Sequence, residues 1–172
     1  MFGYNRSKSI KDDEYYDVGV SCDNDRSIFL DEFDYRFFLS ILEDLILKND
    51  SVEILAYNLD SNYLKFLFSQ KKKDSVVKLL NSLIDRYNTF FVGKYGVDNL
   101  LVKGGCIITE VSHDSLLDVS RDIHLSSNAW IDHPYSSIRA YFYDDTPEWL
   151  SKTHISDIYG SAVKYLEFLE QK

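Results

Sequence analysis

Residues 52–69 form two alternating apolar stretches around a polar turn, and this pattern constrains the fold more than any other part of the chain. Side chains alternate between the two faces of a β-strand, so every second residue points the same way. In the second stretch the alternation places Tyr63 and Lys65 together on one face. The intervening residues 59–62 have the polar composition of a hairpin turn. The sequence therefore predicts an antiparallel hairpin whose other face is buried through Leu64, Phe66 and Phe68.

Two long segments with helical periodicity flank this hairpin, and two further strands complete the pattern. We expect a strand over residues 15–21, helices over 31–48 and 74–92, and a last strand within 100–109. The resulting order is strand, helix, strand, strand, helix, strand, which is the order of a ferredoxin-like split unit. The chain is thus predicted to be an α+β protein with an RRM-like, four-stranded antiparallel sheet. Both helices should lie on one face of that sheet.

Apolar residues at helical spacing indicate which side of each predicted helix faces the sheet. The stripe of the first helix contains Phe33, Phe37, Ile41 and Leu45, with Phe38 and Leu42 beside it. The stripe of the second helix contains Val76, Leu80, Leu83, Tyr87 and Phe91. An aspartate side chain accepts backbone N–H groups at helix N-termini, so Asp31 and Asp74 are predicted to cap the two helices. We expect a core that includes Phe37, Ile41, Leu80, Leu83 and Phe91.

The chain divides into three parts of one domain. Residues 1–14 are polar and charged, and we expect them to form a loose N-terminal tail. Residues 15–110 contain the predicted ferredoxin-like core, and residues 111–172 form a C-terminal helical extension of the same domain. Within the extension we expect helices over 115–125, 130–143 and 156–170. A length of 172 residues is sufficient for one full hydrophobic core.

Charge and cysteine content limit the classes of function. The formal net charge is −9, which is unusual for a protein that grips phosphates, because released counterions supply much of such an affinity. A local basic patch on an acidic body is compatible with this charge, and Lys71, Lys72 and Lys73 are its first candidates. Cys22 and Cys106 are too few for a disulfide framework and lack metal-site spacing. Since there is neither an apolar leader nor a membrane-length apolar stretch, we expect a cytoplasmic protein.

Several short segments, in order along the chain, resemble the motifs of one known family. They are Ile28–Asp31 with Phe33-Asp34-Tyr35 (similar to IFLD..DY..FL), Ser120–Leu125 (SRYIHLNP), Pro134–Tyr141 (PWSSYRAY) and Pro147–Leu150 (P.WL). The family is that of the REP-associated tyrosine transposases, a branch of the HUH single-strand DNA transposases. The resemblance extends from near Tyr16 almost to the C-terminus. It implies the ferredoxin-like fold, DNA as a partner, and Mg²⁺ or Mn²⁺ as the family's cofactor.

The resemblance fails where the family holds its chemistry. The family segment Met-Pro-Asn-His-Val-His, whose two histidines would bind one divalent metal, corresponds to residues 60–65, with Tyr63 and Lys65 at the histidine positions. Because these residues cannot chelate the ion, we expect no metal cofactor. Tyr87 stands where the resemblance places the nucleophile, in a cleft shared with Tyr63 and Lys65, although it fits a core tyrosine equally well. We interpret His124 as a packing residue.

Three functions remain open at this point. The first is a transposase-like protein that has lost metal-dependent cleavage and binds structured single-stranded or hairpin DNA. Its DNA contacts would come from Tyr63, Lys65, Lys71, Lys72, Lys73 and Arg139. The second is a non-catalytic protein-interaction or oligomeric module, such as a homodimer, which the net charge of −9 favours. The third is an active tyrosine transposase with unusual ligands. The residues favour a protein that is not an enzyme.

Overall fold

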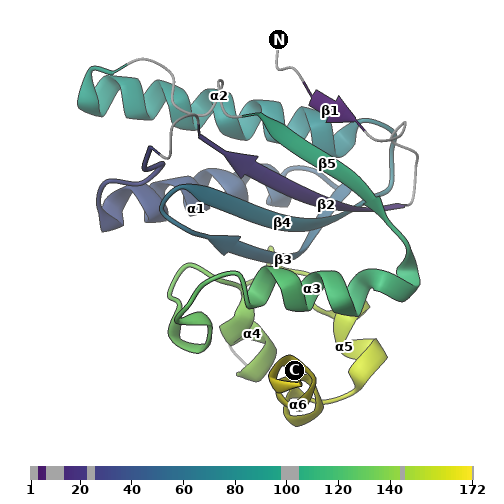
Figure 1. The fold of residues 1–172 in the computed structure, drawn as a ribbon. Helices are drawn as coiled ribbons and strands as arrows, with labels where there is room; N and C mark the ends of the chain where they lie inside the picture. Colours follow the sequence, from purple (N-terminus) through teal and green to yellow (C-terminus); the bar gives the residue numbers. More distant parts are fainter. Residues whose placement is uncertain (1–3, 7–13, 23–25, 98–104, 144–145, 172) are drawn as a thin grey trace.

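A single mixed sheet forms the centre of the molecule. The computed structural model describes residues 4–6, 14–22, 26–97, 105–143 and 146–171 of the chain. The strands are β1 (Tyr4–Arg6), β2 (Glu14–Ser21), β3 (Val52–Leu59), β4 (Tyr63–Gln70) and β5 (Cys106–Val111). Their order in the sheet is β1-β5-β2-β4-β3 (Figure 1). Strands β2 to β5 pair antiparallel in the ferredoxin-like order, which confirms the predicted α+β fold.

Two long helices cover one face of the sheet, as the sequence predicts. α1 (Glu32–Leu47) and α2 (Ser75–Tyr95) both lie behind the sheet in Figure 1. Alternate side chains of the central strands point toward them and share their hydrophobic core, among them Val18, Phe66 and Phe68. Four of the residues expected in this core are buried there: Ile41, Leu80, Leu83 and Phe91.

The N-terminal segment is not wholly a loose tail. Tyr4–Arg6 form β1, which pairs in parallel with β5 in the register Tyr4 to Cys106 and Arg6 to Ile108. Pairing of this kind uses backbone N–H and C=O groups at a sheet edge, and a polar composition does not prevent it. Glu14, the last residue assigned to the tail, is the first residue of β2. The remaining tail residues lie outside the part of the chain that the structure describes.

The buried side of α1 differs from the predicted stripe. Phe38, Ile41, Leu42 and Ile46 face the core, whereas Phe33 is 57% exposed. Phe37 is only half-buried and stacks on Phe90 of α2 with 4.0 Å between ring centroids. The stripe through Phe33 and Phe37 faces the seam between the two helices, so it packs on a neighbouring helix rather than on the sheet. Helical spacing alone does not distinguish these two partners.

The two helices begin with different caps. At α1 the prediction is confirmed: the Asp31 carboxylate accepts the Asp34 N–H at 3.0 Å, and the Asp34 carboxylate accepts the Asp31 N–H at 3.2 Å. Asp74 precedes α2 but makes no capping hydrogen bond, because its backbone is left-handed, with a φ of 62°. In its place the side chain of Gln70, at the end of β4, accepts the Val76 N–H at 3.2 Å.

Shorter helices form a second layer on the opposite face. They are α3 (Leu116–His124), α4 (Ile138–Phe142), α5 (Thr153–Tyr159) and α6 (Ala162–Glu170), with short 3₁₀ turns at His113–Ser115 and Trp130–Asp132. The predicted helix over 130–143 is therefore divided. The one predicted over 156–170 breaks at Gly160, whose φ is 79°, and Ser161 caps the next helix by accepting the Lys164 N–H. No helix in the described part of the chain is long and apolar enough to cross a membrane.

The C-terminal layer is joined to the sheet through the backbone of its edge strand β3. The Leu59 N–H donates to the Tyr135 carbonyl at 3.0 Å, and the Ser137 N–H donates to the Tyr57 carbonyl at 3.0 Å. Further along the strand the Ser151 N–H donates to the Ile54 carbonyl at 2.9 Å. These bonds satisfy groups that a bare edge strand would expose. They also hold the layer against β3.

His124 connects three helices of this layer to the sheet. Its side chain is fully buried, with Nδ1 2.7 Å from the Tyr165 hydroxyl and Nε2 2.7 Å from the Ser137 hydroxyl. The Ser137 oxygen in turn accepts the Tyr57 N–H of β3 at 2.9 Å. His124 is thus a packing residue with both ring nitrogens satisfied, which is the interpretation that the sequence suggests.

Phe38 and Phe33 offer a matched test of the buried face of α1. Phe38→Ala should lower the free energy of unfolding by about 3–5 kcal/mol, because it opens a cavity between the helix and the sheet. Phe33→Ala should cost less than about 1 kcal/mol, since that ring is already largely in water. Urea unfolding followed by circular dichroism measures both. Equal losses would mean that the wrong face of α1 has been assigned to the core.

The buried imidazole of His124 should make the fold sensitive to acid. Burial lowers the pKa of His124 to about 3, from an ordinary value of 6.5. Between these values the unfolded chain binds a proton that the folded chain does not, so stability is lost as the pH falls through this window. The loss from this group should approach about 1.4 kcal/mol per pH unit. Denaturant titrations at about pH 7 and about pH 5 should show a smaller difference for His124→Gln than for wild type.

Candidate functional site

Tyr63 and Lys65 lie on the sheet face opposite α1 and α2. Their neighbours Leu64, Phe66 and Phe68 are buried against the two helices, which confirms the alternation predicted for this strand. Lys65 pairs with Gly19 of β2 on one side and with Asn58 of β3 on the other. The two residues at the family's metal positions therefore share a face with the C-terminal layer.

Lys65 is held among acidic groups on this face. Its ammonium nitrogen lies 3.4 Å from the backbone carbonyl of Asp122 in α3. Asp17, on the same face of β2, is half-buried. Burial raises the pKa of the Asp17 carboxyl and the charge of Asp122 raises it further, whereas the nearby Lys65 ammonium lowers it. The charges of Lys65 and Asp122 thus act on Asp17 in opposite directions.

Tyr63 lies across the neighbouring strand. A Cβ atom added to Gly19 would stand only 2.2 Å from the Tyr63 hydroxyl oxygen, so a residue without a side chain is needed beneath the phenol. The Tyr63 side chain remains 36% exposed. Burial raises the pKa of the Tyr63 phenol, and the neighbouring Asp17 carboxylate raises it further. The phenol is therefore neutral at ordinary pH and is available for contact on its outer side.

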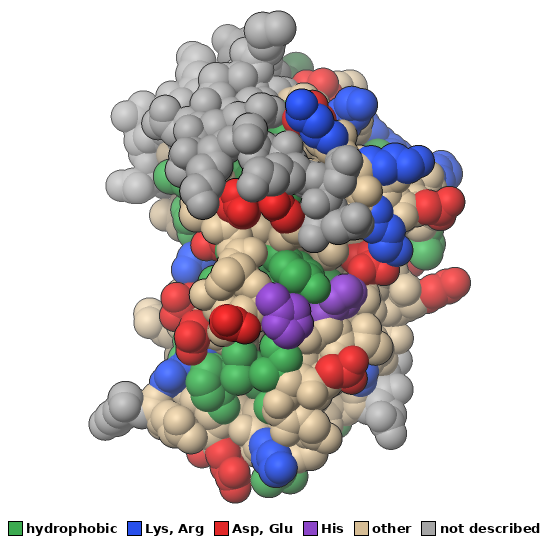
Figure 2. All heavy atoms as spheres, turned by 90° about the vertical axis from the view of Figure 1, so that its right-hand side faces the viewer, with side chains coloured by type: hydrophobic (Ala, Val, Ile, Leu, Met, Phe, Trp, Pro, Cys, Tyr) green, Lys and Arg blue, Asp and Glu red, His purple; other side chains and the backbone are tan. Residues whose placement is uncertain are grey.

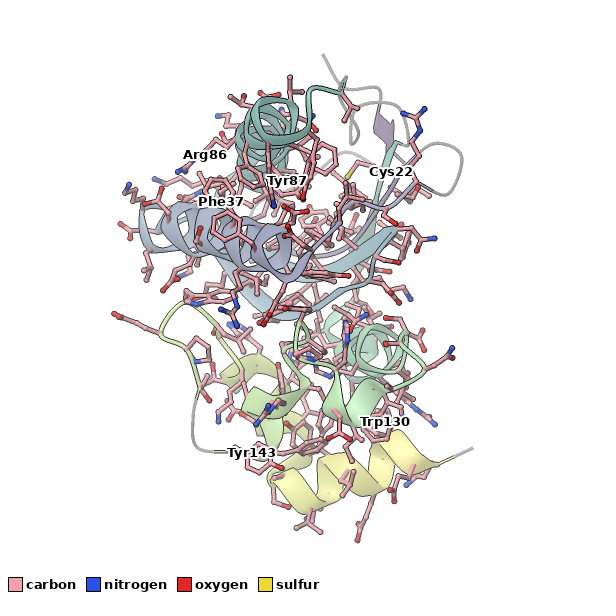
Figure 3. The ribbon with its side chains drawn as sticks, turned by 90° about the vertical axis from the view of Figure 1, so that its left-hand side faces the viewer. Cys22, Phe37, Arg86, Tyr87, Trp130 and Tyr143 are labelled. Carbon is pink, nitrogen blue, oxygen red and sulfur yellow. The ribbon has the colours of Figure 1, made fainter. Side chains whose placement is uncertain are left out.

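Tyr87 lies on the other side of the sheet, so the predicted cleft that it shares with Tyr63 and Lys65 does not exist. Its side chain is fully buried between α1, α2 and the sheet (Figure 3). The hydroxyl donates to the Ile28 carbonyl at 2.7 Å, and the ring packs edge-on against Phe38. Burial holds the pKa of Tyr87 far above its ordinary value. Tyr87 is therefore a core tyrosine, which is one of the two interpretations that the sequence left open.

The helix that reaches Lys65 is α3 rather than α2. It carries Ser120–Leu125, the segment similar to SRYIHLNP, and in that motif a tyrosine occupies the position of Asp122. Asp122 is exposed, and its backbone carbonyl is the group that contacts Lys65.

The three lysines predicted to bind phosphates lie at the other end of β4. Lys71 pairs with Glu53 at 3.2 Å, and Glu53 also lies 2.9 Å from Nε2 of His154. Lys72 and Lys73 are exposed and make no ion pair with any described residue. Figure 2 views this end of the sheet and shows a group of Lys and Arg side chains above two adjacent histidines. The lysines are thus separated from Lys65 by the length of the strand.

Arg139 also lies apart from the sheet face. It is an exposed residue of α4, in the C-terminal layer, and its guanidinium carbon stands 5.8 Å from the centroid of the Tyr143 ring. Figure 3 shows Tyr143 within that layer, well away from Tyr87. The structure therefore brings together Tyr63 and Lys65 alone among the predicted site residues, and it adds Asp17, Gly19 and Asp122 to them.

The side chains around Lys65 do not fit a divalent cation. Mg²⁺ and Mn²⁺ bind oxygen and imidazole ligands, and an ammonium group offers neither a lone pair nor a favourable charge. Across the described residues there is no group of three His, Cys, Asp or Glu side chains placed to hold a metal ion. The acidic groups of Asp17 and Asp122 face a lysine instead.

A groove runs from this site along β2 and β5 toward the start of α3. It has a volume of about 420 Å³, and Asp17, Thr109, Val111, Ser115 and Val119 are among its lining residues. α3 packs mainly on β3 and β4, so Ile107 and Thr109 of β5 remain exposed beside the groove. The groove is polar, shallow and acidic.

Known proteins resemble this chain in structure rather than in sequence. No protein-family model and no curated protein matches it. A REP-associated tyrosine transposase bound to a REP hairpin is similar over 81% of this chain and 84% of its own, with a TM-score of 0.65 and 12% identity. A bacterial tRNA(His) guanylyltransferase-like protein in complex with GTP is similar over 83% and 73%, with a TM-score of 0.50 and 10% identity. A candidate transposase from Deinococcus radiodurans aligns over 75% and 99%, with a TM-score of 0.47 and 13% identity. The chain therefore has the fold of the hairpin-bound transposase.

Proposed function

We propose that this chain is a transposase-like protein that binds folded single-stranded DNA, such as a hairpin, and does not cut it. The observation that carries the proposal is the environment of Lys65. A fixed ammonium group, close to Asp17 and to the backbone of Asp122, occupies the place where cleavage would need a metal ion. The fold shared with a hairpin-bound transposase supports the binding half of the proposal.

The residues around Lys65 argue against metal-assisted cleavage. Such cleavage needs a cation that coordinates the scissile phosphate and stabilises the charge that develops on it. A protonated lysine side chain has no lone pair with which to bind a metal ion, and its positive charge repels a cation. The neutral phenol of Tyr63 is likewise a poor metal ligand. Because Tyr63 and Lys65 stand at the positions of the family's two histidines, neither side chain on this face supplies an imidazole ligand for a metal ion.

Tyr87, at the position where the resemblance implies the nucleophile, does not lie on the same face. The Tyr87 hydroxyl is fully buried and donates to a backbone carbonyl on the far side of the sheet. Reaching a DNA phosphate would require α2 to leave the core. At the end of α3, where the motif has a tyrosine, Asp122 carries a negative charge that repels a phosphodiester.

Binding without cutting requires a contact surface for phosphates elsewhere. Lys72 and Lys73 are exposed at the turn between β4 and α2 and have no ion-pair partner among the described residues. They are therefore available to an external phosphate, whereas Lys71 is paired with Glu53. Because few cations act against a net charge of −9, the binding should be weak and steeply dependent on salt.

Exposed aromatic residues favour a second candidate, a protein-interaction module. Phe33 is 57% exposed and lies in one aromatic cluster with Phe37 and Phe90 along the seam of α1 and α2. The ammonium of Lys94 stands 5.1 Å from the centroid of the Phe33 ring. Exposed aromatic side chains are enriched at protein interfaces. This surface could serve a partner protein or a second copy of the chain without any DNA.

A mobility-shift assay with hairpin DNA at low salt tests the proposed function. Wild type should shift the hairpin, and the Lys72→Ala, Lys73→Ala double variant should bind more weakly. Its plot of log affinity against log salt should be flatter by about one to two units. Lys164→Ala removes an exposed lysine of α6 and is the matched control, which should bind as wild type does. If wild type fails to shift any hairpin, DNA binding is wrong and the interaction module takes its place.

The chemical half of the proposal predicts no metal-dependent reaction. Single-stranded DNA with Mg²⁺ or Mn²⁺ should be neither nicked nor joined covalently to the wild-type protein. The double variant Tyr63→His, Lys65→His places two imidazoles on one strand face beside Asp17, and it should begin to bind Mn²⁺ in calorimetric titrations. Lys65→His alone is the control and should bind far less. A covalent protein–DNA product from wild type would refute the loss of cleavage.

A further inference from the structure

The sheet face that carries Tyr63 is uncovered where Gly19 of β2 pairs with Ile107 of β5. α3 packs on β3 and β4, and Figure 1 shows no helix crossing β2 and β5 on this side. Ile107 of β5 is 59% exposed here, although a β-branched residue in the middle of a sheet is usually buried. Thr109, two residues further along β5, is exposed as well. An uncovered sheet face with apolar side chains is a surface on which a flat ligand can lie.

Tyr63 and Ile107 form the floor of this surface. Ile107 pairs with Gly19 across the sheet, and the Tyr63 phenol reaches over the same glycine from the other side. Gly19 has no side chain, so the backbone between the Tyr63 ring and Ile107 is not covered by a side chain of its own. Nucleobases stack on exposed aromatic side chains of such sheets, with about 1–3 kcal/mol for each stacked base.

Asp17 supplies a hydrogen-bonding group at the edge of this floor. It lies two residues from Gly19 on the same face and pairs with Thr109 of β5. No described residue donates a hydrogen bond to its half-buried carboxylate. An ionised carboxylate is an acceptor with two oxygens, and a partly buried one is stabilised by two adjacent donors. The Watson–Crick edge of guanine presents such a pair, its ring N–H and its amino group.

The charges around the floor select a base rather than a phosphate. Lys65 lowers the pKa of Asp17 and Asp122 raises it, so one cation and two carboxylates lie near the floor. A phosphate placed here would meet net negative charge, whereas the amino edge of a base would be attracted by it. The adjoining groove of about 420 Å³ continues beside Asp17 and gives the base room. The sugar and phosphate would then point away from the sheet.

We infer that the sheet face around Tyr63, Ile107 and Asp17 is a subsite for a single guanine base. The inference rests on the proposed function, since an unpaired nucleotide of a bound hairpin is the source of the base that we favour. Tyr63 is the stacking platform, and the Asp17 carboxylate accepts from the ring N–H and the amino group of guanine. Lys65 favours the ionised form of the Asp17 carboxyl, whereas the charge of Asp122 opposes it. The place of a cleavage site thus becomes a place of base recognition.

Fluorescence anisotropy with labelled hairpins tests the subsite from the DNA side. The hairpins differ only in an unpaired tail that contains guanine, hypoxanthine (which lacks the amino group) or an abasic nucleotide. Guanine should bind about 5- to 100-fold more tightly than the abasic tail, as expected for one stacked base. Hypoxanthine should fall between them. Because these changes leave the protein untouched, the comparison stands even if a variant folds poorly.

Protein variants test the same subsite from the other side. Tyr63→Leu should remove the advantage of guanine over the abasic tail, and Tyr63→Phe should retain it. Asp17→Asn should abolish the difference between guanine and hypoxanthine. Gly19→Ala should displace the phenol, because the new Cβ would stand 2.2 Å from its oxygen, and should weaken binding only while Tyr63 is present. Lys164→Ala is again the control.

The outcomes separate this inference from the function on which it rests. If the hairpins bind but all three tails and the Tyr63→Leu variant behave alike, the subsite is wrong and hairpin binding stands. If no hairpin binds, a titration with guanosine monophosphate decides the matter. Tyr63-dependent binding of the free nucleotide would retain the guanine subsite and refute the DNA proposal. Binding of neither ligand would overturn both.

Discussion

The hydrogen bonds along the edge of β3 determine how the two layers of this protein meet. Residues 135–137 and 150–151 pair with that strand at its open side, so the C-terminal helices are held at one edge of the sheet. From there α3 packs mainly on β3 and β4, and Ile107 of β5 remains exposed. The partial cover is what creates a surface beside Tyr63. A layer attached at the centre of the sheet would have closed it.

Much of the fold could be predicted because it depends on local signals. Alternation placed Leu64 and Lys65 on opposite faces correctly, and Asp31 caps α1 as its residue type suggests. Other features depend on partners distant in sequence. The cap of α2 comes from Gln70 instead of Asp74, and the seam between the helices takes Phe37 away from the sheet. These contacts exist only after the chain has folded, so spacing alone could not reveal them.

The candidate site was predicted only in part, for a related reason. The sequence correctly paired Tyr63 with Lys65, because a strand period of two is sufficient for that. The cleft that the resemblance implied for Tyr87 does not form, because the apolar stripe of α2 packs on the sheet face opposite Tyr63 and Lys65; the core position that the sequence also allowed is the one observed. Gly19 and Asp17 have no motif at all. They matter because β2 runs beside β4, a relationship that follows from the sheet order rather than from the residues themselves.

The junction at His124 has a consequence for how such a protein can change over time. Its buried imidazole forms hydrogen bonds with the hydroxyls of Tyr165 and Ser137. Replacing any one of these three residues would therefore leave buried polar groups of the other two without a hydrogen-bond partner. Substitutions at His124, Tyr165 and Ser137 are therefore expected to depend on one another. Tyr63 and Lys65 are only partly buried, and Asp17 lines an open groove, so fewer contacts constrain these side chains. The molecule thus combines a framework that resists substitution with a surface whose residues are less constrained.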